Sequence, residues 1–199
     1  MAITNGYASL NEVKASLKIT DGMDDSLLEM AIESASRLID GYTGRYFYNG
    51  GSAVKNFAAQ DWWLVQIEDL QSVTEVASTD EVGGTYTVWT ANDYQLEPLN
   101  GRVEGTVSPA TRTRAVNNYS WPVNEEQALV RVTGTWGWSS VPIAVKQATI
   151  LQAARIFKRL DSPLGVAGFG DMGVVRVGSR LDPDVQHLID PYRAMRNFG

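Results

Sequence analysis

The sequence predicts an α+β fold, in which a small helical bundle carries an inserted antiparallel β-domain and a C-terminal arm. Apolar residues recur at helical spacing in an N-terminal hairpin, residues 1–49, and in a long core helix, residues 138–161. Between them, residues 50–137 consist of short stretches rich in Val, Thr, Tyr and Trp that glycine pairs interrupt, as strands and turns do. The last segment, residues 162–199, begins rich in glycine and ends in a short amphipathic helix.

The N-terminal hairpin begins with a short helix. Ser9, followed three residues later by Glu12, forms a capping-box pattern at its start. Its apolar residues recur at helical spacing: Leu10, Val13 and Leu17. A break at residues 21–22 then separates this helix from a longer one.

The second helix of the hairpin begins near Asp24 and Asp25, whose carboxylates suit a helix N-terminus both as caps and against the dipole. Gly41 and Gly44 mark its expected end. One face is apolar: Leu28, Ala31, Ala35, Leu38 and Tyr42. Two short helices cannot bury such a face alone, so a third element is expected to cover it.

The β-domain is expected to be antiparallel, because its strands are short and separated by turn signals. The predicted strands are residues 54–57, 64–67, 73–78, 86–89, 94–96 and 129–136. The polar stretch 105–124, with Pro109 and Pro122, is predicted to be a long loop.

The core helix begins at Val141 and Pro142, where proline suits the first turn. Two of its faces are apolar, which predicts burial between partners. These faces are Ala144, Ala148 and Leu151 on one side and Ile143, Ile150 and Phe157 on the other. Three bases near its end complement the helix dipole: Arg155, Lys158 and Arg159.

The C-terminal arm has four glycines within residues 165–173, which is poor material for a core of its own. A short helix opens at Asp182-Pro183, and Pro191 is expected to end it after about two turns. Its apolar stripe consists of Val185, Leu188, Ile189 and Tyr192.

Composition excludes several classes of site. The chain has 199 residues, no cysteine and one histidine, His187, which excludes disulfides, thiolate sites and a multi-histidine metal cluster. No segment is long and apolar enough to cross a membrane and no signal segment is evident, so we expect a soluble protein made in a cytoplasm. The net charge of −6 divides into −10 over residues 1–110 and +4 over residues 111–199. The acidic total argues against general nucleic-acid binding, and the basic half suits an acidic partner surface or a solvated face.

Two short sequence patterns resemble ligand-binding motifs, but their surroundings in the sequence do not fit the corresponding sites. Residues 168–173 match G-x-G-x-x-G, but a helix precedes and a strand-like stretch follows, the reverse of a dinucleotide site. Residues 21–25 resemble a calcium loop, yet Met23 stands at a required ligand position, and helix capping explains the acids better. We therefore predict no enzyme activity, no cofactor and no metal.

Six tryptophans fall in or beside the β-domain: Trp62, Trp63, Trp89, Trp121, Trp136 and Trp138. If exposed, they would form a sugar-stacking face or a protein interface. If buried, they are the core of a small sheet, which is the interpretation preferred for most of them. A carbohydrate- or surface-binding module is therefore the alternative function.

Three segments carry a family resemblance. They are YASLNEVKASLK (residues 7–18), DDSLLEMAIESASRLIDGYTGR (24–45) and VPIAVKQATILQAAR (141–155). With the glycine-rich segment and the ending RLDPD…PYR (180–193), they cover about half the chain. Their order resembles the head–tail connector family of long-tailed bacteriophages, also called adaptor or head-completion proteins. None is a catalytic signature, and the β-insertion departs from the smaller, mostly helical members.

The resemblance implies a structural virion protein at the head–tail interface, assembled in the host bacterial cytoplasm. It implies a homo-oligomeric ring, of twelve copies in the family expectation, below the portal protein. Such a ring extends the DNA channel, lies close to phage DNA without sequence preference, and presents a platform to a stopper or tail-completion protein. No membrane is involved.

The expected docking surface for the portal or a neighbouring subunit is the arm, residues 162–199, which resembles a segment that orders on binding. Its candidate docking residues are Leu164, Val166, Phe169, Val185, Leu188, Ile189, Tyr192 and Arg193. Deleting residues 181–199 is expected to leave a folded protein that no longer joins the portal. Glu29 and Glu33 are candidates for a channel wall that repels DNA, and Glu33 also stands four residues before Arg37 in the favourable order for an ion pair.

Overall fold

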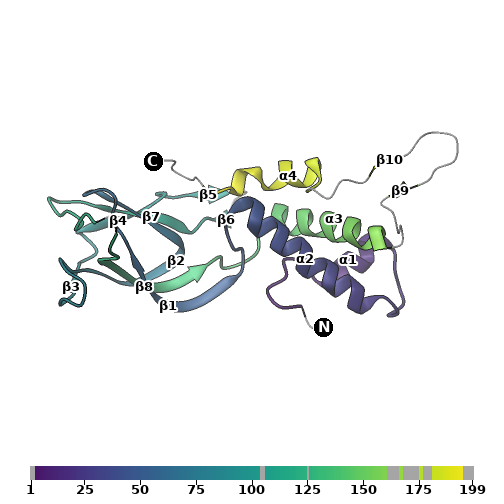
Figure 1. Ribbon diagram of the computed structural model, residues 1–199, viewed down its shortest axis with the longest axis horizontal. Helices are drawn as coiled ribbons and strands as arrows, with labels where there is room; N and C mark the ends of the chain where they lie inside the picture. Colours follow the sequence, from purple (N-terminus) through teal and green to yellow (C-terminus); the bar gives the residue numbers. More distant parts are fainter. Residues whose placement is uncertain are drawn as a thin grey trace. The chain divides into compact units, whose positions relative to one another are not determined.

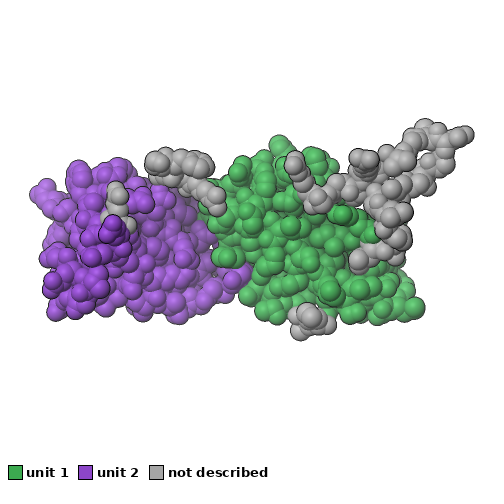
Figure 2. Space-filling view, in the orientation of Figure 1, with its two compact units in different colours: residues 1–47, 141–199 green, residues 48–140 purple. Residues whose placement is uncertain are grey.

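The computed structural model describes residues 3–103, 106–124, 126–160, 166–167, 175–176 and 181–194. It divides the chain into two compact units, coloured separately in Figure 2. Unit 1 comprises residues 1–47 and 141–199, and unit 2 comprises residues 48–140. Unit 1 is helical and unit 2 is built on an antiparallel sheet, so the predicted α+β class is confirmed.

Unit 1 is built around two long helices, α2 (Asp25–Thr43) and α3 (Ile143–Leu160), which pack against each other (Figure 1). The short helix α1 (Leu10–Leu17) contacts both of them. The C-terminal helix α4 (Pro183–Ile189) packs on α3 and continues into a 3-10 turn, η1 (Asp190–Tyr192). The two-residue strands β9 (Val166–Ala167) and β10 (Val175–Arg176) pair between α3 and α4 in the chain.

The ends of the N-terminal helices follow local sequence signals. The Ser9 hydroxyl accepts from the Glu12 backbone N–H, and the Glu12 carboxylate accepts from the Ser9 backbone N–H at 2.8 Å, so the predicted capping box is present. That backbone hydrogen bond from Ser9 is the main reason the pKa of Glu12 lies below its usual value. Asp24 takes the N-cap position of α2 but makes no capping side-chain bond, which corrects its predicted role. Gly44, with φ +68°, ends α2, and Gly41 lies inside the helix.

The buried faces of the long helices differ from the predicted ones. In α2, Leu38 is exposed and Ile39 takes its place in the core with Leu28 and Ala35, because the buried stripe follows i+4 and i+7 steps from residue 28. In α3, Ile143 and Leu151 are exposed, although both were predicted to be buried. A second apolar face therefore remains open on each helix.

Unit 2 contains a six-stranded antiparallel sheet with the order β1-β8-β2-β7-β4, and β3 pairs with β2 (Figure 1). The strands are β1 (Asn49–Phe57), β2 (Leu64–Ser78), β3 (Thr87–Val88), β4 (Tyr94–Glu97), β7 (Ala110–Ala115) and β8 (Val130–Gly137). A separate two-stranded hairpin pairs β5 (Arg102–Val103) with β6 (Thr106–Val107).

Two predictions in this region were wrong. Residues 64–67 and 73–78 belong to one strand, because irregularities near Leu70 and Val73 shift the alternation of side chains and conceal its continuity. The predicted loop 105–124 contains β6 and β7. Strand β7 has a polar sequence because Arg112 and Arg114 both pair with Glu97 on the neighbouring β4.

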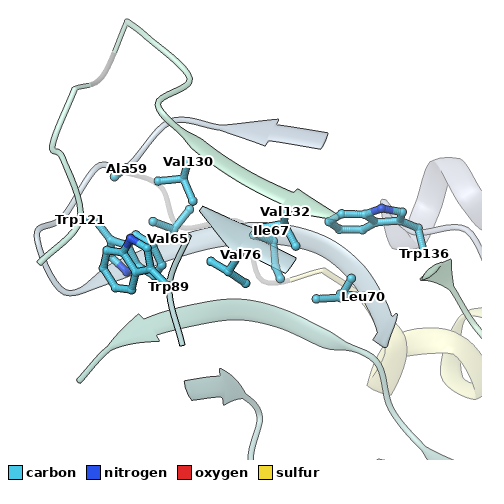
Figure 3. Close-up of a cluster of buried hydrophobic side chains, with 10 residues drawn as sticks. All are labelled: Ala59, Val65, Ile67, Leu70, Val76, Trp89, Trp121, Val130, Val132 and Trp136. Carbon is cyan, nitrogen blue, oxygen red and sulfur yellow. The ribbon is translucent and has the colours of Figure 1, made fainter. Parts of the chain in front are cut away.

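The core of unit 2 lies on one face of β2 and β8 (Figure 3). In β8, buried and half-buried residues alternate from Val130 to Trp136, as the sequence predicted. Trp89 and Trp121 stack at the other end of the cluster, with ring centroids 3.8 Å apart. This core contains only residues of unit 2, and the helical core of unit 1 contains only residues of unit 1.

Candidate docking and assembly surfaces

The C-terminal helix is seated in unit 1 by its own apolar stripe. Its N-cap is Asp182, whose side chain accepts from the Asp184 backbone N–H, and Pro183 occupies the first turn as predicted. Val185, Ile189 and Tyr192 are fully buried. Burial of apolar side chains is the main stabilising term in packing, so these residues hold α4 in place.

Polar contacts fix both ends of the same segment. At the start of α4, Asp182 forms an ion pair with Arg155 of α3. At its end, Tyr42 of α2 donates a hydrogen bond to Asp190 at 2.6 Å, and the Ala194 backbone N–H donates to the Thr43 carbonyl at 2.7 Å. The C-terminal segment is thereby tied to both long helices.

These contacts divide the predicted docking residues into two groups. Val185, Ile189 and Tyr192 are buried within the chain and could serve a partner only if α4 left its seat. Leu188 is half-buried and Arg193 is exposed beside the Tyr42 ring, at 5.0 Å from its centroid.

The remaining predicted docking residues belong to the glycine-rich segment. Leu164 and Phe169 lie outside the described residues, as does the G-x-G-x-x-G match at 168–173. The backbone of Val166 lies in β9.

A buried polar cluster, which no sequence pattern predicted, lies at the C-terminal half of α2. The Tyr7 hydroxyl donates to Asp40 and accepts from the Phe47 backbone N–H at 2.9 Å. Arg37 pairs with the other oxygen of Asp40 at 2.8 Å. Burial raises the pKa of Tyr7 and that of Asp40, since each charged form is separated from water. This cluster fixes the N-terminal segment and the end of α2 together; a tyrosine and an aspartate 33 residues apart give no local signal of it.

A hollow of about 350 Å³ opens beside this cluster. It is lined by Arg37, Asp40, Gly41, Gly44 and Tyr46. A Cβ atom added at Gly41 would meet no other atom of the residues that the structure describes, so none of these residues requires glycine there.

The two candidate channel acids lie side by side on α2 and are half-buried. Glu33 pairs with Arg37 at 3.6 Å, the i,i+4 pair that the sequence predicted, and accepts a hydrogen bond from the Thr4 backbone N–H at 3.3 Å. Its charge is thus partly balanced within the chain.

Most of the tryptophans are core residues, as the preferred interpretation held. Trp89, Trp121, Trp136 and Trp138 are buried, and Trp63 is half-buried under Arg114. Trp62 is 61% exposed. The described tryptophans therefore offer one open indole rather than a stacking face.

Within the described ranges, no three His, Cys, Asp or Glu side chains are grouped so that they could hold a metal ion. Among the same residues, no helix is both long and apolar enough to span a membrane. His187 is exposed on α4.

Comparison with known proteins connects this arrangement to a family. Residues 7–80 match the family model of the phage gp6-like head-tail connector proteins. No curated protein matches the chain significantly. A chain from the neck of an empty GTA particle, a structure computed with C6 symmetry, is 20% identical, with a TM-score of 0.57 over 100% of this chain and 95% of that chain. The resemblance to the phage head–tail connector family is therefore confirmed, over the residues that supply α1, α2, β1 and β2.

Proposed function

We propose that this chain is a structural, non-enzymatic connector of a phage or phage-like virion, which assembles as a ring beneath the portal protein. The observation that carries the proposal is the connector-family match over residues 7–80, supported by a fold shared along the whole chain with a particle-neck protein. In this role the ring extends the DNA channel and presents a platform to the stopper or tail-completion protein.

The proposed ring contains twelve copies. The particle neck that shares this fold was computed with C6 symmetry, and twelve is a multiple of six. Closed rings require a heterologous contact, in which one surface of each copy meets a different surface of the next.

The proposed portal contact lies on the C-terminal arm, residues 162–199. Among the candidate docking residues that the structure describes on α4 and after it, the exposed Arg193 and the half-buried Leu188 are those that a partner can reach while α4 stays packed on α3. Val185, Ile189 and Tyr192 are buried, so their role in this proposal is to hold α4 in the position from which Leu188 and Arg193 contact the partner. Deletion of residues 181–199 is consequently a poor test of portal binding. It would expose the apolar surface of unit 1 on which α4 packs and would thereby destabilise the chain.

The test is co-sedimentation of the purified chain with assembled portal rings from the same genome, followed by negative-stain imaging. A ring added beneath the portal is the expected result. Arg193→Glu, with Lys18→Glu as a charge-matched control on an exposed residue outside the arm, should weaken that binding selectively. No binding of the unaltered chain to well-formed portal rings would remove the proposal.

We propose, in addition, that Glu29 and Glu33 contribute negative charge to the channel wall, which repels the DNA backbone and lets it slide. Glu29→Lys with Glu33→Lys should slow DNA ejection from assembled particles. Unchanged retention and ejection would show that these acids do not face the channel.

A further inference from the structure

The two long helices of unit 1 each expose an apolar face, although they pack against each other. On α2, Leu27, Met30 and Leu38 are 41%, 54% and 41% exposed. On α3, Ile143 and Leu151 are 76% and 44% exposed. Isolated exposed apolar residues are ordinary, but rows of them along one helix face mark interaction sites.

The exposed face of α2 is a stripe that is largely uncharged. Ser34 and Gly41 are exposed in line with its apolar residues, and the exposed Arg37 borders the stripe one turn before Gly41. Glycine inside a helix costs about 1 kcal/mol relative to alanine. Since no atom of the described residues approaches the position of a Gly41 Cβ, a close approach by another molecule would account for glycine there.

The exposed face of α3 is shorter and mixed. Its apolar residues Ile143 and Leu151 flank the exposed Gln147, and the exposed Lys158 lies two turns further along. At 1.5 Å per residue, the exposed apolar residues span about 17 Å on α2, from Leu27 to Leu38, and about 12 Å on α3.

The two stripes lie on opposite sides of the α2–α3 pair. In α2, Met30 follows two residues after the core residue Leu28, and residues two apart are about 160° apart around a helix. In α3, Leu151 has the same relation to the core residue Ala153. Met30 and Leu151 therefore face away from the helix that the buried side of their own helix contacts, so these two residues of one chain cannot meet.

The helices also have opposite net charges. Helix α2 contains four acids and one base, a net charge of −3, whereas α3 contains four bases and no acid, a net charge of +4. Some of these charges are paired within the chain, as Asp25 is with Lys14 and Lys146 with Glu12. Exposed apolar residues on helices of opposite net charge are nevertheless complementary. Because they lie on opposite sides of one chain, each fits a second copy in a head-to-tail contact.

We propose that the open stripe of α2 in one copy packs on the open stripe of α3 in the next copy, and that this contact builds the ring. The inference rests on the connector function proposed above and assigns its subunit interface. Ser34 and Gly41 allow the two helices to approach closely, and the hollow beside Gly41 receives a side chain of the neighbouring α3.

The natural absence of cysteine allows a direct test. Met30→Cys combined with Leu151→Cys places one thiol on each stripe, and a flexible bismaleimide tolerates an offset between them. The double variant should cross-link into a ladder of trimers and larger species, whereas each single variant should stop at dimers. The matched control, Met30→Cys with Val88→Cys, places its second thiol on an exposed residue of unit 2 and should cross-link at least about tenfold more slowly. Equal rates for the control and the double variant would overturn the inference.

Charge substitutions give a second, independent readout. Met30→Asp and Leu151→Asp alter exposed positions, so both should keep the circular dichroism of the unaltered chain. Each should reduce assembly on portal rings by at least about tenfold, as substitution at a central interface residue does, and Val88→Asp should not. If the unaltered chain binds portal rings and both Asp variants bind equally well, the interface is wrong and the connector function stands. If the cysteine pair forms ladders but the chain does not bind the portal, the connector function fails and the interface stands.

Discussion

At the scale of single residues, close backbone approach decides which glycines are irreplaceable. Gly134 lies in β8, where an added Cβ would come within 2.2 Å of the Ser72 carbonyl oxygen on β2. Gly137 has φ +87°, and its Cβ would lie 2.1 Å from the Tyr48 carbonyl oxygen. Both contacts are with backbone atoms, one in β2 and one in the residue before β1, so relief requires the neighbouring backbone to move.

We predict that Gly134→Ala lowers the free energy of unfolding by about 2–3 kcal/mol, since overpacking against backbone forces a shift of the paired strands. Gly41→Ala is the matched control. It adds a methyl group into open space inside a helix and should leave the free chain unchanged or more stable by up to about 1 kcal/mol. Urea denaturation of both variants measures the difference, and equal stability of the two would show that β8 and β2 are not closely apposed.

The carboxylate of Glu97, on the edge strand β4, is expected to make the stability of unit 2 depend on pH. Hydrogen bonding from Arg114, helped by the charge of Arg112, holds the pKa of Glu97 below its ordinary value of 4.5. A lowered pKa in the folded state means that the ionised form is preferred there. Its stabilising contribution is present above pH 4.5 and is lost as the pH falls through the lowered pKa.

We therefore expect Glu97→Gln to flatten the acid limb of the stability profile of unit 2, with the largest difference from the unaltered chain above pH 4.5 and convergence as the pH falls below it. Asp80→Asn, an exposed acid of the same unit, is the control. Thermal unfolding from pH 3 to pH 7 gives the measurement. A constant offset between Glu97→Gln and the unaltered chain at every pH would contradict the assigned role.

At the scale of elements, α4 shows how a short helix becomes stable. A helix of seven residues is not stable in isolation, so its order comes from packing on α3 and from the N-cap at Asp182. Its apolar stripe was predicted to contact a partner, but most of this stripe is buried within the chain. The stripe was correctly predicted, but periodicity alone does not say which surface covers it.

We predict that Ile189→Ala destabilises unit 1 by about 2–4 kcal/mol, as large-to-small changes at fully buried sites do. Leu188→Ala, one residue earlier and half-buried, should cost less than half as much. Denaturant titrations followed by hydrogen exchange at α3 amides would measure both. Equal costs at the two positions would mean that α4 is not seated as described.

At the scale of the whole molecule, the described residues form a hydrophobic core in each unit, and the charge is unevenly distributed along the chain. The net charge of −6 belongs to residues 48–140, which contain eleven acids and five bases, whereas the rest of the chain contains twelve of each. Residue 110, which separates the acidic and the basic parts of the sequence, is the first residue of β7 and so lies inside the sheet of unit 2. Tertiary structure therefore assigns the excess acid to unit 2 and leaves unit 1 neutral.

We expect residues 48–140, expressed alone, to fold cooperatively, because their core draws on no residue outside that range. Burial of Trp89, Trp121 and Trp136 should give the fragment blue-shifted tryptophan fluorescence and a sigmoidal urea transition. The variant Val132→Ala, at a fully buried position, should shift that transition to lower urea in the fragment and in the full chain alike. A fragment that is unfolded in buffer would contradict this independence.

The sequence by itself determined the features that depend on near neighbours. The capping box at Ser9 and Glu12, the Gly44 terminus of α2, the Asp182-Pro183 start of α4 and the alternation of β8 all involve residues a few positions apart. Each is a local hydrogen-bonding or steric preference that does not require knowledge of the rest of the chain.

Tertiary structure alone decided which apolar surfaces are covered and which stay open. Helix α2 is apolar both at Leu28, Ile32 and Ile39 and at Leu27, Met30 and Leu38, so its sequence allows either face to be buried. Which face of α2 is buried depends on its packing against α3, a helix about a hundred residues further along the chain. In the same way, Asp40 is hydrogen-bonded to Tyr7, a residue 33 positions earlier in the sequence. The free energy of burial depends on the partner that removes water from a surface, and that partner is fixed only when the chain folds.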